Sequence, residues 1–273
     1  MSRWSQELDF ANQVARAAGE ILRASYGHVE RVDRKSRRDV VTEVDFASER
    51  LVLDAIRGRY PEDAILAEES GHHRRAGRRD GTGRTWVVDP LDGTVNYANG
   101  IPYFCVSVAL VAEGAPAVGV VYDPLRDDCY AATADGGATH NGRPAVASVK
   151  EDLGDFVVSL AVIGRGGIGR ERRIGREIRI PRRMGSAALA LAYVANGRFD
   201  AFVQNGGLSL WDVAAAGLIV ERAGATVSSL DGGAWWDAGR RSASVSVVAA
   251  PQPHHGKLLE LLAATRTAVR TRR

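Results

Sequence analysis

Helical and strand-like segments are mixed along this chain without the regular strand–helix alternation of a doubly wound sheet, and this mixture constrains the fold most. Apolar residues recur at helical spacing from Ser5 to Ser25, which predicts a first helix. A second helix is expected to begin after Thr42, whose hydroxyl can cap it while Asp45 reaches back, and to end before Pro61. Together with the strands that follow, this pattern predicts an α/β (α+β) fold of layered sandwiches.

Short apolar strands and turn signals fill the middle of the chain. Strands are expected at 64–67 and 86–88, and then at 104–112, 117–122 and 129–133, where the spacing of the turns indicates an antiparallel meander. Asn141-Gly142 predicts a further tight turn. The polar, basic and glycine-rich segment 72–84 is expected to be a mobile surface loop.

A change in composition near 149–155 indicates an internal boundary. We expect an N-terminal α+β part, residues 1–149, and a C-terminal α/β part, residues 150–273, which together form one compact unit. In the second part, a flexible stretch is expected at 164–169, with the other elements as follows: strands at 156–161, 177–180, 200–203, 225–228 and 245–249, and helices at 186–196, 211–223 and from 254 to about 269.

Composition and charge exclude several classes of protein. Hydrophobic residues make up 45% and charged residues 25% of the chain, which excludes general disorder. The net charge of +3 is mild and the arginine clusters lack interleaved aromatic residues, so these clusters are expected to be solvated, and nucleic-acid binding is not expected. Two cysteines cannot build a disulfide framework. With no apolar signal core and no run of membrane-spanning length, a cytoplasmic protein without membrane contact is expected.

Carboxylates at the ends of apolar strands and at a helix start carry the functional information. Glu68 follows one apolar strand, Asp89 follows the next, and Asp92 lies three residues further on, while Asp212 opens the helix at 211–223. Such acids lie next to the core, where unpaired charges are costly, so they require cations. Oxygen ligands without an accompanying Cys or paired His favour Mg²⁺ over zinc.

The hexapeptide Asp89-Pro90-Leu91-Asp92-Gly93-Thr94 joins two of these acids in one turn. Pro90 fixes the backbone between them, and the carbonyl of Leu91 is available as a further oxygen ligand. Gly93 leaves the backbone open to a phosphate, and Thr94 can orient a water through its hydroxyl. The hexapeptide alone is also a good turn sequence, but in combination with the other acids it predicts metal-assisted hydrolysis of a phosphate ester.

Five stretches of the chain resemble the signature set of the inositol monophosphatase family: 39–45, 68–70, 86–94, 185–201 and 211–217. The resemblance covers essentially the whole chain. It implies an alternating αβαβα fold and a cytosolic enzyme that is often a homodimer. It also implies hydrolysis of a small phosphorylated metabolite with two or three Mg²⁺ ions, for which Mn²⁺ could substitute and which Li⁺ would inhibit.

The resemblance further implies a role for each matching residue. The first metal would be held by Glu68, Asp89 and the Leu91 carbonyl, and the second by Asp89, Asp92 and Asp212. A third, weaker ion would rest on Glu68 and waters. The catalytic residues would be Asp45, Glu68 and Thr94, with Asp45 pairing with Thr94 and accepting a proton from the attacking, metal-activated water. The residues around the substrate would be Asp92, Gly93, Thr94, Gly185, Ser186, Gln204 and Asp212.

The substrate stays open at this level. Gln204 stands where inositol-specific members usually carry a glutamate, so a small phosphorylated polyol or sugar is expected rather than myo-inositol 1-phosphate in particular. The alternatives are histidinol phosphate, a 3′-phosphonucleotide and fructose 1,6-bisphosphate. A non-enzymatic RNA- or protein-binding regulator on the same fold is a further alternative, against which the complete set of acids argues.

Other polar residues receive weaker expectations. Glu69 is expected to project away from Glu68, and the role of Lys35, which resembles a family lysine, is left open. His254 and His255 are expected to cap the last helix or to face solvent. We also hypothesise that a set of basic residues favours substrates with extra negative charge: Arg74, Arg75, Arg78 and Arg79.

Overall fold

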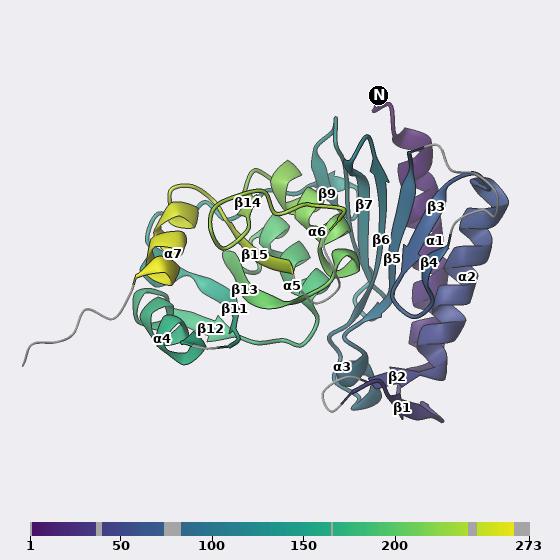
Figure 1. Ribbon diagram of the computed structural model, residues 1–273, viewed down its shortest axis with the longest axis horizontal. Helices are drawn as coiled ribbons and strands as arrows, with labels where there is room; N and C mark the ends of the chain where they lie inside the picture. The colour runs from purple at the N-terminus through teal and green to yellow at the C-terminus, as the bar shows by residue number, and fades with distance from the viewer. Residues whose placement is uncertain (1, 37–39, 74–82, 165, 240–244, 265–273) are drawn as a thin grey trace, which may run out of the picture.

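Helices and sheets alternate in five layers in the computed structural model, which describes residues 2–36, 40–73, 83–164, 166–239 and 245–264 (Figure 1). Two helices cover an eight-stranded sheet, two more separate it from a five-stranded sheet, and a last pair covers the outer face of that second sheet. The predicted αβαβα fold is therefore confirmed. In the order of the layers, the helices are α1 (Ser5–Ser25) and α2 (Glu43–Arg59), α5 (Ala187–Ala192) and α6 (Leu210–Arg222), and α4 (Gly167–Glu177) and α7 (His254–Ala263).

The first two helices follow the sequence pattern closely. Helix α1 has the predicted bounds and buries its apolar face, including Val14 and Leu22. Helix α2 begins with the predicted capping box, in which the Thr42 side chain accepts a hydrogen bond from the Val44 N–H and the Thr42 N–H donates to Asp45 Oδ2 at 2.8 Å. Helix α2 thereby fixes the backbone and the carboxylate of Asp45 together.

The eight-stranded sheet contains the predicted meander. Its strand order is β10-β9-β8-β7-β6-β5-β3-β4, and neighbouring strands are antiparallel except for β3 and β5. Asn141 and Gly142, both with positive φ, form the predicted turn between β9 and β10. The strand bounds are β3 (Ala64–Ala67), β4 (Gly71–His73), β5 (Thr85–Asp92), β6 (Cys105–Ala112), β7 (Ala115–Asp123), β8 (Asp128–Thr133), β9 (Ala138–His140) and β10 (Arg143–Pro144).

The five-stranded sheet has the order β12-β11-β13-β15-β14, with β11 parallel to both of its neighbours. Its strands are β11 (Val157–Val162), β12 (Ile180–Arg182), β13 (Ala201–Leu208), β14 (Thr226–Ser228) and β15 (Val245–Ala250). The remaining elements are a small sheet of β1 (Val32–Arg34) and β2 (Val40–Thr42), the short helix α3 (Thr94–Ala98), and two 3₁₀ turns at Leu153–Asp155 and Tyr193–Asn196. The two large sheets draw their strands from either side of residue 149, although the division into two parts stays a prediction.

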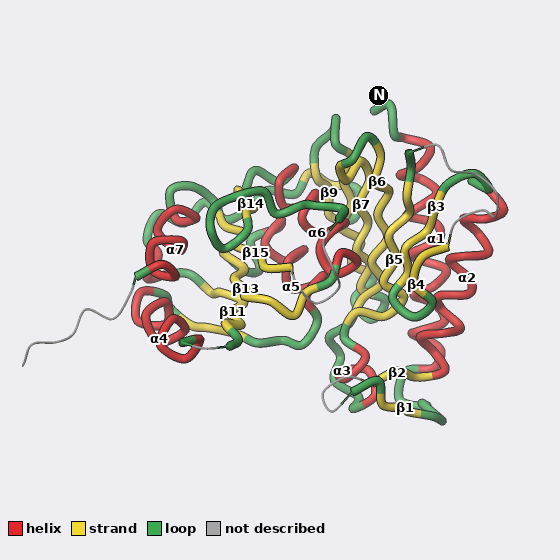
Figure 2. The backbone as a smooth tube through the Cα atoms, in the orientation of Figure 1, coloured by secondary structure: helices red, strands yellow, loops and turns green. Residues whose placement is uncertain are grey.

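Helix α6 packs between the two sheets and is apolar on almost every side. Its residues Val213 to Val220 are all buried, as expected for a helix covered on both faces. A Cβ atom built on Gly119 of β7 would lie 2.6 Å from the carbonyl oxygen of Ala215, so this glycine permits the closest approach of helix and sheet. The segment after β14 folds back over α6 (Figure 2), where Trp235 Nε1 donates to Glu221 Oε1 at 2.8 Å.

Several expectations for the second half are wrong. The second half of the stretch expected to be flexible at 164–169 begins helix α4 at Gly167, and the strand expected at 177–180 lies at 180–182 as β12. The helix expected at 186–196 is α only to Ala192 and continues as a 3₁₀ turn. His254 and His255 are buried and neither caps α7 nor faces solvent. The last helix ends at Ala263 within the described residues, which stop at 264.

The segment predicted to be a loop at 72–84 is described only at its ends. Residues 71–73 form strand β4 at the edge of the large sheet, paired antiparallel with β3. The four arginines singled out at 74–79 lie outside the described residues. Across the described part of the chain, none of the helices combines the length and the hydropathy needed to cross a membrane.

Candidate metal and phosphate site

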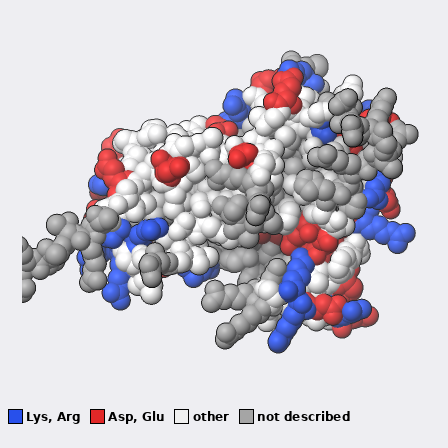
Figure 3. Space-filling view, in the orientation of Figure 1, with Lys and Arg blue, Asp and Glu red and all other residues white. Residues whose placement is uncertain are grey.

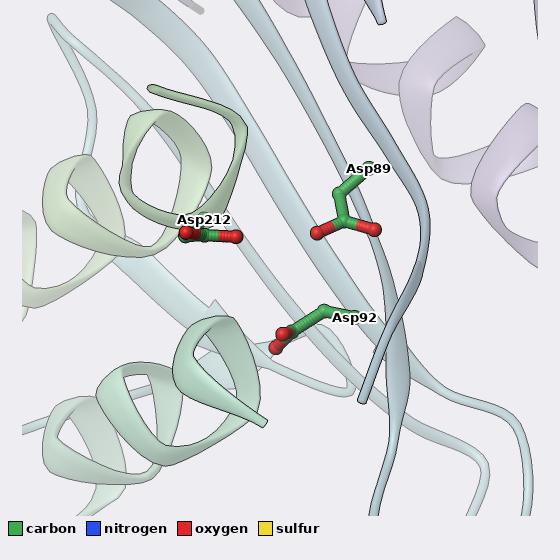
Figure 4. Close-up of side chains that lie close together, drawn as sticks. All are labelled: Asp89, Asp92 and Asp212. Carbon is green, nitrogen blue, oxygen red and sulfur yellow. The ribbon is translucent and has the colours of Figure 1, made fainter. Parts of the chain in front are cut away.

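The hexapeptide Asp89 to Thr94 forms an irregular end of strand β5. Asp89 pairs with Ser107 of β6 and Asp92 with Cys105, so the register shifts by one residue between the two acids. Pro90 lies within this irregularity, as expected for a residue that cannot donate to the ladder. The bulge aims both carboxylates at the same side of the sheet, where Figure 4 shows them facing Asp212.

Three carboxylates from two different elements converge at this point. One oxygen from each of Asp89, Asp92 and Asp212 lies within 4.8 Å of the others. Asp89 and Asp92 are buried at the end of β5, and Asp212 is half-buried in the first turn of α6. The Ser209 N–H donates to Asp212 Oδ2 at 2.6 Å, which fixes the carboxylate at the helix start. The structure therefore brings together three of the predicted metal ligands.

Asp92 is also held by the N-terminal end of α5. Its carboxylate accepts hydrogen bonds from Ser186 Oγ at 2.5 Å, from the Ala187 N–H at 3.2 Å and from the Ala188 N–H at 2.7 Å. Ser186 is expected to contact the substrate, but in this structure its hydroxyl donates its hydrogen to Asp92. Gly93, with φ of +101°, packs so closely that an added Cβ would lie 3.2 Å from Ser186 Cβ.

Thr94 and Asp45 form the predicted pair. Thr94 Oγ1 lies 2.9 Å from Asp45 Oδ1 and 3.0 Å from the carbonyl oxygen of Leu91, either of which can accept its single hydrogen. The hydroxyl oxygen keeps lone pairs that can accept a hydrogen bond from a water. Burial raises the pKa of Asp45 from its ordinary value of 3.8 to about 6, although hydrogen bonds from Thr42 and Thr94 favour its ionised form.

Glu68 follows β3 and shares an ion pair with Lys35 that the sequence did not predict. Lys35 Nζ is 2.9 Å from Glu68 Oε1 and 2.5 Å from Glu69 Oε1. The expectation that Glu69 projects away from Glu68 is therefore wrong, because both carboxylates reach the same ammonium. Burial raises the pKa of Glu69 to about 7 despite this neighbour, and Lys35 is held charged because the two acids raise its own pKa.

The donor set fits a hard divalent cation. Burial raises the pKa values of the three aspartates and of Glu68. Neighbouring carboxylates raise the pKa values of Asp89 and Asp212 further. For Glu68, the ammonium of Lys35 partly opposes burial, and for Asp92 hydrogen bonds from Ser186 and backbone amides do so. Buried carboxylates that are reluctant to ionise next to one another are stabilised in their charged form by a cation, and oxygen donors match Mg²⁺.

A cleft of about 540 Å³ opens from the acid cluster toward the five-stranded sheet. Of the residues predicted to surround a substrate, its lining includes Asp92, Gly185, Ser186, Gln204 and Asp212, with Glu68 beside them. Gly93 and Thr94 are not among the described residues that line it. The sequence analysis missed other members of the wall: Ser159, Arg183 and Trp211. Ser159 and Arg183 belong to none of the signature stretches, and Trp211, although it opens the stretch 211–217, was not assigned a place at the site; folding brings all three to the cleft.

Comparison with known proteins places this chain in a family. The model of the inositol monophosphatase family matches residues 3–270. The chain is 39% identical to the Nus factor SuhB of Pseudomonas aeruginosa over 244 residues, which cover 82% of this chain and 86% of that protein. It is 38% identical to an inositol-1-monophosphatase of Mesorhizobium japonicum over 229 residues, covering 81% and 84% of the two chains.

Similarity in three dimensions agrees with the sequence matches. The structure is similar to the crystal structure of the extragenic suppressor protein SuhB from Bartonella henselae, with a TM-score of 0.86 at 32% identity, over 95% of this chain and 99% of that one. From the family match, the relatives and the fold together, this chain belongs to the inositol monophosphatase family.

Proposed function

We propose that this chain is a Mg²⁺-dependent phosphomonoesterase that hydrolyses a small phosphorylated polyol or sugar. The observation that carries the proposal is the convergence of Asp89, Asp92 and Asp212 within 4.8 Å, with Asp92 and Asp212 in the lining of a cleft. In the proposed site the ions are held by the three aspartates together with Glu68 and the carbonyl of Leu91. Mn²⁺ is expected to substitute for Mg²⁺, Li⁺ to inhibit, and the active form to be a homodimer.

The chain's own residues account for proton handling at the attacking water. Thr94 accepts a hydrogen bond from the water while its hydroxyl donates to Asp45 Oδ1, 2.9 Å away. Asp45, whose pKa is raised to about 6, takes up the proton that the water loses. When bound, Mg²⁺ supplies Lewis acidity that lowers the pKa of a coordinated water and offsets negative charge on the phosphate.

Substrate is held in this proposal by the opposite wall of the cleft. Gln204 and Ser159 are neutral, hydrogen-bonding side chains, which suit the hydroxyls of a polyol or sugar. The nearby Trp211 contributes an apolar surface. Histidinol phosphate, a 3′-phosphonucleotide and fructose 1,6-bisphosphate remain alternatives within the same chemistry, and a substrate panel separates them.

Release of phosphate with and without Mg²⁺ tests the proposal. We expect release from at least one member of a panel of inositol, histidinol, nucleotide and sugar phosphates, and its loss in EDTA. Asp92→Asn keeps the shape of the side chain but removes a charged ligand, so it should abolish turnover. Asp54→Asn is the matched control, because Asp54 is exposed on α2 and pairs with Arg50 and Arg57 at the surface. Absence of Mg²⁺-dependent release from the whole panel would refute the proposal.

The relatives named Nus factor SuhB supply a second candidate, a regulator that binds RNA or protein on the same fold. The basic side chains of α4 favour it modestly, since Arg170, Arg172 and Arg176 make no ion pair within the described ranges. The complete acid cluster favours the enzyme, because clustered buried carboxylates are costly to keep without a use. A salt-dependent mobility shift of RNA that Asp92→Asn retains, without phosphatase activity, would favour the regulator.

A further inference from the structure

Among the described residues that line the cleft, Arg183 is the one positively charged side chain. The charged side chains of the described lining are the acids Glu68, Asp92 and Asp212 and one base, Arg183, whose side chain is largely exposed. The neutral polar side chains of the lining include Ser159 and Gln204. The acids are accounted for by metal binding, but neither ion binding nor the proposed attack on the phosphate uses a guanidinium in this place. Arg183 therefore needs a separate explanation.

The backbone that carries Arg183 is fixed to the acid cluster. Asn96 Nδ2 donates to the carbonyl oxygens of Met184 at 2.8 Å and Tyr103 at 2.7 Å, which ties the segment before α5 to the segment before β6. Two residues after Met184, Ser186 Oγ donates to Asp92. A short, well-anchored stretch of chain thus joins the guanidinium to a metal ligand, and Arg183 has a defined place relative to the site.

Most of the hydrogen-bonding capacity of Arg183 is unused. Its Nη2 lies 2.6 Å from Glu171 Oε1 on α4, and this oxygen also accepts the Val162 N–H at 2.8 Å. A guanidinium has five N–H donors, so one contact leaves the other donors for a second anion. The side chain remains 62% exposed. The contact with Glu171 orients the guanidinium group of Arg183 but leaves it accessible to a ligand.

The surroundings of Arg183 favour an anion over a neutral group. Helix α4 carries three arginines without ion pairs within the described ranges, Arg170, Arg172 and Arg176. Lys and Arg side chains gather over α4 and β12 in Figure 3. Glu171 offsets part of this charge but is shared with a backbone amide. The local excess is positive, whereas the other charged residues of the described lining are acidic.

We propose that Arg183 binds a second phosphate of the substrate, so that the preferred substrates are polyol or sugar bisphosphates. One phosphate lies at the acid cluster, where it is cut, and the other is held by the guanidinium fork. The hydroxyls of the carbon skeleton face Ser159 and Gln204. Ser159 makes no side-chain hydrogen bond within the described residues and is available for this contact. The inference rests on the proposed phosphatase function and names its substrate class.

Matched pairs of substrates on the full chain test this assignment. Inositol 1-phosphate is compared with inositol 1,4-bisphosphate, and fructose 1-phosphate with fructose 1,6-bisphosphate, each with Mg²⁺. The measured quantity is the ratio of kcat/KM for the bisphosphate to that for the monophosphate. We expect this ratio to be about ten in at least one pair. This value is at the low end of what a charge-assisted hydrogen bond contributes, because Arg183 is partly exposed.

Three variants separate recognition from folding. Arg183→Ala should lower the bisphosphate value about tenfold more than the monophosphate value, and Arg183→Lys should retain part of the preference because it keeps the charge but loses the fork. Arg182→Ala is the control, since Arg182 is exposed, makes no ion pair within the described residues and does not line the cleft. A merely structural effect would lower both values in proportion and leave the ratio unchanged.

The possible outcomes distinguish failure of the bisphosphate preference from failure of the proposed phosphatase function. Loss of the preference in Arg183→Ala, but not in Arg182→Ala, supports the inference. Activity with no preference for a bisphosphate, or a preference that Arg183→Ala leaves intact, overturns it and leaves the proposed phosphatase standing. If neither member of any pair releases phosphate with Mg²⁺, the proposed function fails, and the inference fails with it.

Discussion

Raising the pH of the ion-free protein should destabilise it, and Asp45 allows the size of the effect to be worked out. Its side chain is fully buried and its pKa is raised from 3.8 to about 6, so the folded state holds the proton more tightly than the unfolded state. Stability from this group is present in full below the unfolded pKa and is lost as the pH rises through the folded pKa. Between pH 5 and pH 8 the loss is about 1.4 kcal/mol.

The assay is thermal unfolding in EDTA at pH 5 and pH 8, with and without the substitution Asp45→Asn. Asparagine cannot titrate, so the drop in stability between the two pH values should be smaller in the variant by about 1.4 kcal/mol, or about 3–6 °C in melting temperature. Glu69, with its pKa raised to about 7, adds a drop of the same sign in both proteins. Asp54→Asn should behave as the wild type, because Asp54 is exposed.

Addition of Mg²⁺ provides an internal check of the same argument. An ion bound among the acids favours their charged forms and stabilises the folded state, so the dependence on pH should become flatter. If Asp45→Asn and the wild type lose equal stability between pH 5 and pH 8 in EDTA, or if stability rises with pH, the burial argument for Asp45 is wrong.

Three further substitutions probe other parts of the structure. Thr94→Val keeps the shape but removes the hydroxyl between water and Asp45, so kcat should fall about 10²- to 10⁴-fold in a phosphate-release assay. Asn96→Ala leaves two carbonyl oxygens without their donor and should cost about 1–3 kcal/mol in the free energy of unfolding, measured with urea. Gly119→Ala places a Cβ 2.6 Å from the Ala215 carbonyl oxygen and should cost about 1–3 kcal/mol, whereas Gly175→Ala, with open space around it, should cost nothing. Equal melting temperatures for the two glycine variants would contradict the close approach.

The sequence predicted those features that depend on local chemistry. Helix α1 has an apolar stripe along its whole length, and the Thr42 cap of α2 needs only residues three positions apart, so both were predicted correctly. The three aspartates could be singled out because each follows an apolar strand or opens a buried helix. Their convergence within 4.8 Å depends on the packing of α6 against β5 and β6, which the sequence does not state.

The errors fall where tertiary contacts override local preference. Helix α4 contains two interior glycines, which disfavour a helix, yet Ile174 anchors it in the core. Lys35 lies 33 residues from Glu68, so no local pattern could reveal their contact. The sequence predicts that the two histidines at the start of α7 cap the helix or face solvent, but His255 Nε2 lies 2.9 Å from Ser228 Oγ inside the fold.

The convergence of carboxylates from β5 and α6 has a consequence for how the molecule unfolds. The cluster exists only when the N-terminal sheet and the helix from the C-terminal half are docked, so an ion that binds there is bound by both at once. Its binding free energy is then shared between the halves and favours their joint melting in a single transition. Removing such ions would take away this linkage and leave three aspartates repelling one another where sheet and helix meet. Cooperativity of unfolding should thus follow the Mg²⁺ concentration, so that ions bound here would belong to the architecture as well as to the proposed chemistry.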